Sequence, residues 1–399
     1  MAKAAEPLAT SPAPYPYRWR SARLALGTAS ALGLARFAYG LLVPAMRDQL
    51  DWSLARAGAM TTANGFGYLA GALAAAAVAR RLTNTTAFRL GMAGTAVALA
   101  ATAISGNYLA LLAARVAAGL AGALVFVSGG VLAARLAARA GSAMPVTVYY
   151  AGTGLGIVGG GAALPPLLDQ HSGRWPLAWV GLAAVAAVAA AVSWTATPAE
   201  RETAAEATGR RQLRPLWRVA AAHLVFAAGY IAYITFLSAY LADHHASVPQ
   251  VALVWTVLGL SVVAAPGLWN RPIAAWGGAR ALAALLAILT LAAALPLLSA
   301  ALPVVLVSAV AYGATFMVVP AAITALIRYG MPPADWTPTL AAFTALFAAG
   351  QTAGPWLAGV LADHTTAAAT LAWTAVLCAI AAGFAVTQQQ PEPQPRLPA

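Results

Sequence analysis

Two arginines interrupt long apolar runs of this sequence. Arg36 lies within SALGLARFAYGLLVP, residues 30–44, and Arg115 lies in a second run that is equally poor in charge. A guanidinium stays protonated at physiological pH, and its fork of N–H donors fits carboxylate, sulfonate or phosphate oxygens. Because an arginine at the centre of a membrane helix costs about 3 kcal/mol on insertion scales, each of these side chains needs an acceptor.

The acidic residues of the sequence offer these arginines no obvious partner. All 11 Asp and Glu residues lie in tails, loops or the ends of apolar runs, and Asp48 is about 18 Å from Arg36 at the helical rise. Arg36 and Arg115 are expected at similar depths, about 15 Å and about 12 Å from the outer ends of their runs, which are the C-terminal end for Arg36 and the N-terminal end for Arg115. They therefore predict a site for an anionic ligand. The alternative is a structural role, in which glycines such as Gly33 bring backbone carbonyls within reach.

Aromatic and polar side chains supply the remaining candidate ligand contacts. Tyrosine combines a stacking surface with a hydroxyl, which suits aromatic or amphipathic ligands. For each residue the alternative is packing against lipid or a neighbouring helix. The candidates are Tyr39, one turn from Arg36, and Tyr230, Tyr233, Asn64 and Trp255.

One histidine, His223, lies inside an apolar run. Histidine titrates near physiological pH, which suits a coupling proton, and the alternative is an interfacial histidine with no chemical role. Asp243, His244 and His245 are adjacent and cannot converge easily on one ion, so we predict no metal site. The sequence has no catalytic motif and no phosphate-binding glycine loop, and we expect neither an enzyme nor a cofactor.

Composition places most of the chain in a lipid bilayer. Of its 399 residues, 61% are hydrophobic and 9% are charged, against about 25% charged in soluble domains. Apolar runs of about 20 residues that are rich in Ala and Leu predict membrane helices. Twelve such runs are present, at 21–46, 54–79, 88–106, 107–134, 143–168, 175–195, 217–241, 248–269, 280–300, 302–328, 338–361 and 367–386. The predicted fold class is an all-α membrane protein with twelve transmembrane helices.

Basic residues indicate how these helices are oriented. With both termini in the cytoplasm, eighteen of the 23 Lys and Arg residues fall on the cytoplasmic side and three on the outer side, as the positive-inside rule expects. This topology explains the net charge of +12, and we therefore expect no nucleic-acid partner.

The longest polar interval divides the chain into two halves. The predicted parts are a disordered cytoplasmic tail at 1–20, a six-helix bundle at 21–195, a cytoplasmic linker at 196–216, a second six-helix bundle at 217–386 and a disordered tail at 387–399. The stretch GLARF around Arg36 aligns with GYIAY, which contains Tyr230 and Tyr233, at an offset of 196 residues. This alignment indicates an internal repeat.

Several stretches resemble the major facilitator superfamily of secondary transporters. Arg115-xxx-Gly119 resembles the signature of that family's fourth helix, and GTGLGIVGGG resembles the glycine motif of its exporters and antiporters, with Ile157 where that motif has proline. GLARFAYGLLVPAM, TANGFGYLAGAL and GYIAYITFL are similar to the YbfB/YjiJ-type bacterial subgroup. The resemblance implies two pseudo-symmetric six-helix bundles around a midplane site, which the first, fourth, seventh and tenth helices line.

Glycines in the fifth apolar run are expected to let helices approach closely, in packing or gating. They are Gly152, Gly156, Gly160 and Gly161.

We expect a secondary transporter of the bacterial inner membrane that works as a monomer by alternating access. Its substrate is predicted to be a small organic anion or acidic amphipathic molecule, which it exports or exchanges, with a proton as the candidate coupling ion. One alternative is a multidrug exporter of neutral or cationic amphiphiles. An alternative of another class is a membrane sensor or assembly partner that transports nothing.

Overall fold

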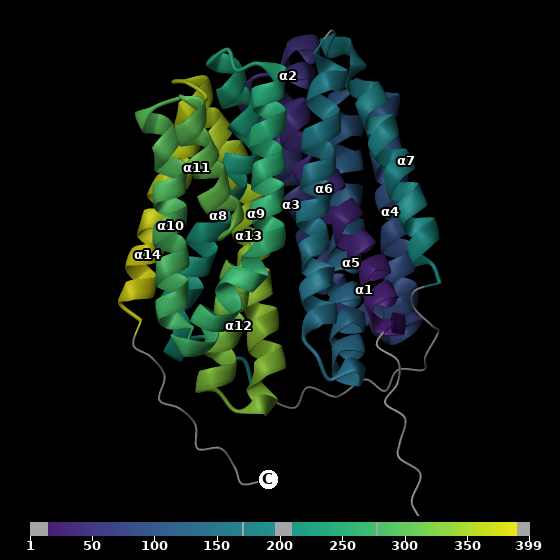
Figure 1. Ribbon diagram of the computed structural model, residues 1–399, viewed down its shortest axis with the longest axis vertical. Helices are drawn as coiled ribbons and strands as arrows, with labels where there is room; N and C mark the ends of the chain where they lie inside the picture. Colours follow the sequence, from purple (N-terminus) through teal and green to yellow (C-terminus); the bar gives the residue numbers. More distant parts are fainter. Residues whose placement is uncertain (1–14, 170, 196–209, 277, 389–399) are drawn as a thin grey trace, which may run out of the picture.

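Helices make up the structure (Figure 1). The computed structural model describes residues 15–169, 171–195, 210–276 and 278–388, and within these ranges it contains no strand. Helical segments occupy each of the twelve ranges that hydropathy predicts. Nine helices of the described part are long and apolar enough to cross a membrane. The all-α membrane class is therefore confirmed.

The helices of the first half are α1 (Tyr15–Thr28), the π-helix η1 (Ala29–Phe37), α2 (Tyr39–Leu50), α3 (Leu54–Leu82), α4 (Asn84–Ile104), α5 (Tyr108–Ala140), α6 (Met144–Leu168), the short 3-10 helix η2 (Ser172–Arg174) and α7 (Trp175–Ser193). Those of the second half are the short 3-10 helix η3 (Arg214–Leu216), α8 (Trp217–Asp243), α9 (Val248–Ala275), α10 (Ala279–Leu298), α11 (Leu302–Gly313), α12 (Val319–Gly330), α13 (Pro333–Asp363) and α14 (Ala368–Val386).

The first helix begins earlier than the sequence predicts. Helix α1 starts at Tyr15, so residues 15–20 of the predicted disordered tail are helical. Pro16 lies in the first turn, where its missing N–H would have had no intrahelical partner. The predicted tail regions 1–14 and 389–399, and residues 196–209 of the predicted linker, lie outside the described residues.

Two of the predicted helices are interrupted near their middles. The first contains π-helix η1 between α1 and α2, and the predicted helix at 302–328 is divided into α11 and α12 by turns at residues 314–318. The rings of Phe37 and Phe316 join the two interruptions edge to face, with centroids 5.7 Å apart. Both irregular segments therefore meet inside the helix assembly.

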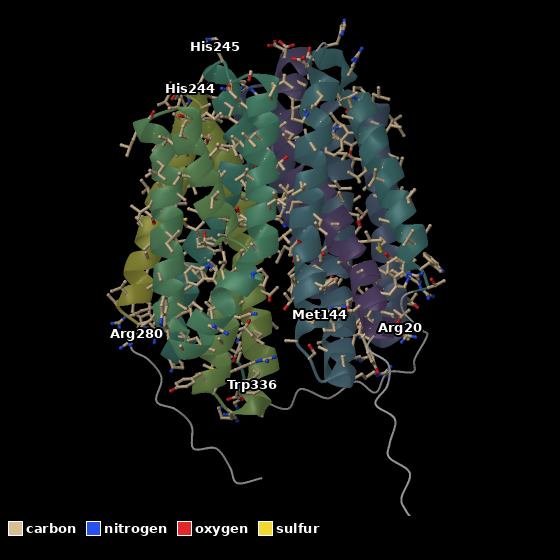
Figure 2. All side chains as sticks on the ribbon, in the orientation of Figure 1. Arg20, Met144, His244, His245, Arg280 and Trp336 are labelled. Atoms are coloured by element: carbon tan, nitrogen blue, oxygen red, sulfur yellow. The ribbon has the colours of Figure 1, made fainter. Side chains whose placement is uncertain are left out.

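The two ends of the molecule are marked by different side chains. Figure 2 shows Arg20 and Arg280 at the end where α1 begins and α14 ends, which we call the terminal end. His244 and His245 lie at the opposite end, which we call the distal end. Most helices run from one end to the other, as Figure 1 shows.

The helices α1–α7 pack mainly among themselves, as do α8–α14. In the first group α3 packs on α5, and α6 packs on α1 and η1. In the second group α8 packs on α13 and α14. The groups meet where α3 contacts α13, α6 contacts α9 and α2 contacts α8, and Figure 1 shows them side by side.

Glycines set the spacing of α6 from the first helix. A Cβ added at Gly152 would lie 2.1 Å from the carbonyl oxygen of Ala25, and one at Gly156 would lie 2.3 Å from that of Ala29. On the other face of α6, a Cβ at Gly161 would lie 2.7 Å from the Cβ of Trp255 on α9. Helix α6 therefore lies close to η1 and also to the second group of helices.

A charged group joins the two groups of helices at the distal end. The carboxylate of Asp363, at the end of α13, accepts hydrogen bonds from the backbone N–H groups of Leu54 and Ala55 at 2.6 and 3.0 Å. These donors are the first of α3, where the helix has unpaired N–H groups and a partial positive charge. A Cβ added at Gly359 would lie 2.4 Å from the carbonyl oxygen of Leu54, so backbones meet there without intervening side chains.

Replacing Gly156 by alanine should loosen the packing of α6 on η1. The added methyl group would lie 2.3 Å from a backbone oxygen and 2.8 Å from the Cα of Gly33, and overpacking of this kind costs about 1–3 kcal/mol. We expect the melting temperature of the detergent-purified variant to fall. Gly159→Ala is the matched control, because a Cβ there meets nothing within 4 Å. Equal melting of the parent and both variants would contradict the packing role of Gly156.

Candidate functional site

Arg36 lies on π-helix η1 at the contact between the two groups of helices. Its side chain is 5% exposed. The wider turn is visible in the bond from the Ala38 N–H to the carbonyl oxygen of Gly33, five residues earlier, at 2.9 Å. Single π-turns inside α-helices occur frequently at functional sites. The wider helical turn thus lies at the residue that carries the charge.

Three elements from both halves of the chain surround the Arg36 guanidinium. Its Nη2 donates to the hydroxyl of Tyr230 on α8, at 3.2 Å, and to Oε1 of Gln351 on α13. The Tyr230 hydroxyl also donates to Gln351 Oε1, at 3.2 Å. The guanidinium carbon lies 5.1 Å from the ring centre of Tyr68 on α3. Every partner of the charge is therefore neutral.

Two hydrogen-bond donors of this site have no acceptor in the part of the chain that the structure describes. Arg36 Nε and Gln351 Nε2 are buried, and neither has a hydrogen-bond partner among the described residues. The described acidic residues lie at helix ends or in connections, and none pairs with Arg36. A buried donor without an acceptor costs about 1–3 kcal/mol, so the site has a surplus of donors and of positive charge.

Arg115 on α5 is held differently. It is 1% exposed, and its Nη1 donates to the carbonyl oxygen of Ala35 at 2.7 Å. Its guanidinium carbon lies 5.1 Å from the ring centre of Tyr39 and 5.3 Å from that of Trp179, so aromatic rings contribute cation–π attraction. Asn64 donates to the carbonyl oxygen of Arg115 at 3.2 Å. Arg115 thus contacts the backbone of the residue that precedes Arg36.

Three other predicted contact residues have their polar atoms engaged inside the protein. The hydroxyl of Tyr39 donates to the carbonyl oxygen of Ala57 at 2.8 Å. Tyr233 shares a hydrogen bond with Ser308 at 2.6 Å, and Trp255 Nε1 donates to Ser238 at 2.9 Å. All three side chains are at most 1% exposed. Among the predicted aromatic contacts, Tyr230 is therefore the one that the fold brings to Arg36 by a hydrogen bond.

A row of rings extends from Tyr230 along α8 and α13. Tyr230 stacks on Phe226 and on Phe347, with ring centroids 5.0 and 5.4 Å apart. His223, the predicted coupling residue, stacks on Phe347 at 5.1 Å and lies near Phe226 and Phe343. It is 4% exposed, and its Nδ1 has no hydrogen-bond partner among the described residues. Because Tyr230 is hydrogen-bonded to Arg36, the row connects Arg36 with the buried imidazole of His223.

The phenylalanines of α13 are missing from the sequence-based set of contact residues, whereas Gln351, like Asn64, is visible in the sequence as a polar residue of an apolar run that needs a partner. Phe343, Phe347 and Gln351 recur every four residues, which places them on one helix face. His223, Phe226 and Tyr230 on α8 are separated by three and four residues, which also places them on one helix face. These two stripes were the available signal, but spacing alone does not say which other helix face each stripe contacts.

Comparison with known proteins agrees with this architecture. The family model described as "Uncharacterised MFS-type transporter YbfB" matches residues 28–387. A search of curated protein sequences gave no match.

Solved structures with the same fold are themselves transporters. A mutant of the nucleoside transporter NupG superposes with a TM-score of 0.67 at 14% identity, covering 93% of this chain and 98% of that one. A bacterial homologue of the human lysosomal transporter Spinster, inward-facing and unoccupied, gives 0.65 at 15% identity and covers 93% and 95%. The inward-facing occupied form of that homologue gives 0.59 at 17% identity and covers 94% and 95%. Together with the family match over nearly the whole chain, this means that the protein belongs to the YbfB-type family of major facilitator superfamily transporters.

Proposed function

We propose that this membrane-spanning protein is a secondary transporter that exports or exchanges a small organic anion by alternating access. The observation that carries the proposal is the buried Arg36 guanidinium, which is surrounded by neutral partners and lies between the two groups of helices. A ligand that brings a negative charge would neutralise it. The donors left unpaired at Arg36 Nε and Gln351 Nε2 would bind the oxygens of such a ligand.

Participation of both halves supports alternating access. Arg36 belongs to the first half, whereas Tyr230 and Gln351 belong to the second. A ligand bound among them would contact both halves, and relative movement of the halves would then change its access. We place the terminal end in the cytoplasm of a bacterial inner-membrane protein with twelve crossings, because that orientation agrees with the distribution of basic residues.

The many aromatic rings would suit a multidrug exporter of amphiphiles, but the positive charge of Arg36 does not. A cationic amphiphile would meet Arg36 at the same place, and the described residues supply no carboxylate beside it. We therefore favour an anion.

Replacing Arg36 by glutamine should abolish anion transport. The variant keeps a polar side chain but removes the charge that holds the substrate, and we expect uptake of radiolabelled organic acids into proteoliposomes to fall at least about tenfold, the effect of about 1.4 kcal/mol. Arg56→Gln is the control, because Arg56 is exposed near the distal end and stacks on Tyr108. Unchanged anion uptake in the Arg36 variant would refute the proposed site. Uptake of cationic dyes by the parent, with no uptake of anions, would establish the multidrug alternative.

Replacing Asp363 by asparagine should favour opening at the distal end. The change removes a charged acceptor from two backbone donors of α3, and hydrogen bonds to charged groups contribute about 1.5–3 kcal/mol. The reporter is a cysteine at Thr61, which is buried and contacts Thr235 across the two groups at 3.2 Å, in a Cys378→Ala background. We expect maleimide to label it at least about tenfold faster in the Asp363→Asn protein.

Asp335 provides the matched control for this experiment. It lies at the other end of the same helix, where it accepts hydrogen bonds from Arg210 N at 2.8 Å and Gln212 Nε2 at 3.2 Å. Asp335→Asn should not accelerate labelling at the distal end. Equal acceleration by both substitutions would show general loosening and would contradict a specific distal closure.

His223 is our candidate for the coupling proton, since its buried Nδ1 has no partner and its ring adjoins the row that leads to Tyr230. His223→Gln should retain anion exchange between the two sides of the membrane but lose stimulation of uptake by an imposed pH gradient. Proteoliposome assays with and without the gradient separate these activities. Full stimulation in the variant would assign coupling to another group.

A further inference from the structure

The site next to Arg36 combines one unneutralised charge with flat ring surfaces. We propose that it takes an aromatic monocarboxylate, whose carboxylate displaces the Gln351 oxygen from Arg36 and whose ring packs against Tyr230 and Phe347. This inference rests on the proposed anion transport and names the class of anion.

A neutral amide, that of Gln351, occupies the position next to Arg36 where the carboxylate of the ligand would bind. Gln351 Oε1 accepts from both Arg36 Nη2 and the Tyr230 hydroxyl, which leaves Gln351 Nε2 and Arg36 Nε as buried donors without acceptors. A carboxylate on the Nε–Nη2 edge of the guanidinium would accept two parallel hydrogen bonds. Once displaced, the Gln351 amide can donate its N–H to the same carboxylate. One planar anion would thus satisfy both unpaired donors.

The available charge matches a monoanion. Arg115, the second buried arginine, already donates to the backbone of Ala35 and is flanked by the rings of Tyr39 and Trp179. These neutral partners do not cancel the charge of Arg115, and its Nε is also unpaired among the described residues, but Arg36 is the arginine that is hydrogen-bonded to Gln351, whose amide carries the other unpaired donor. A monoanion bound there would neutralise the charge of Arg36, whereas a dianion would bring a second charge for which Arg36 offers no partner, and a buried unpaired charge is strongly unfavourable.

The aromatic side chains next to Arg36 and Gln351 favour a ligand that carries an aromatic ring. Tyr230 lies nearly parallel to three rings, at interplanar angles of 24° to Phe226, 26° to Phe347 and 21° to Phe316. Phe347 is only half-buried, so part of its surface is accessible to a ligand. Offset stacking favours an aromatic ring over a saturated ring of the same size by about two- to tenfold in affinity.

Paired ligands on the unaltered protein provide the decisive test. Binding of benzoate and phenylacetate to the detergent-purified transporter is compared with that of cyclohexanecarboxylate and cyclohexylacetate by isothermal titration calorimetry. We expect each aromatic acid to bind at least about threefold more tightly than its saturated partner, and benzyl alcohol, which lacks the charge, to show no binding.

Two pairs of variants test recognition of the aromatic ring and recognition of the carboxylate separately. Phe347→Leu should remove the preference for the aromatic acids while retaining the saturated ones, whereas Phe343→Leu, one turn away and in contact with His223 rather than Tyr230, should keep it. Gln351→Glu should place a permanent carboxylate on Arg36, abolish binding of all four acids and raise the melting temperature. Gln250→Glu is its control, because Gln250 caps the first turn of α9 at the distal end through Ser247 N.

The outcomes distinguish this inference from the proposed function. Equal affinities within both ligand pairs would overturn the aromatic class and leave anion transport intact. Failure of all four acids to bind, or unchanged acid binding by Gln351→Glu, would overturn the assignment of the carboxylate position. Because the ligand pairs are measured on the parent protein, poor folding of a variant does not prevent a decision.

Discussion

The charge of Arg36 is the constraint around which the interior of this protein is arranged. The fold buries this guanidinium between two groups of helices, with a hydroxyl, an amide oxygen and ring faces as its partners. Neutral oxygens lower the cost of burial but do not cancel the charge. Buried donors without acceptors next to it reduce stability, and such a loss of stability is typical of functional sites.

Irregular backbone places that charge where both halves can reach it. An unbroken α-helix would continue the direction of α1, whereas π-helix η1 changes the register at residues 29–37. The break between α11 and α12 lies opposite, and Phe316 in that break contacts Phe37, Tyr230 and Tyr312. Regular α-helix is resumed on either side of both interruptions, so the membrane-spanning backbone satisfies most of its hydrogen bonds locally.

Close backbone contact explains how long helices can meet at such a site without gaps. Glycines on α6 allow contact with η1 on one face and with α9 on the other, and glycines at the distal end bring α3 against α13. In lipid, where there is no hydrophobic force between helices, close packing and interhelical hydrogen bonds provide the attraction. The Asp363 carboxylate adds an electrostatic contact to the first N–H groups of α3. The contacts of Asp363 and Gly359 lie at the distal end, whereas those between α6 and α9 lie further along the helices.

Much of this protein is determined by local sequence. Hydrophobic length predicted the helical segments, because a membrane helix must satisfy its own backbone whatever surrounds it. The isolated charge of Arg36 was equally visible, since an arginine in an apolar run is costly in any fold. The partners of that arginine were not visible: Tyr230 and Gln351 lie 194 and 315 residues away, and helical spacing does not say which stripe faces which. Only tertiary packing decided that the backbone of Ala35, the residue before Arg36, supplies the acceptor for Arg115. It also decided that Arg36 itself contacts neutral side chains from the other half. The physical reason is that hydrogen bonding acts over about 3 Å and therefore depends on which helices become neighbours.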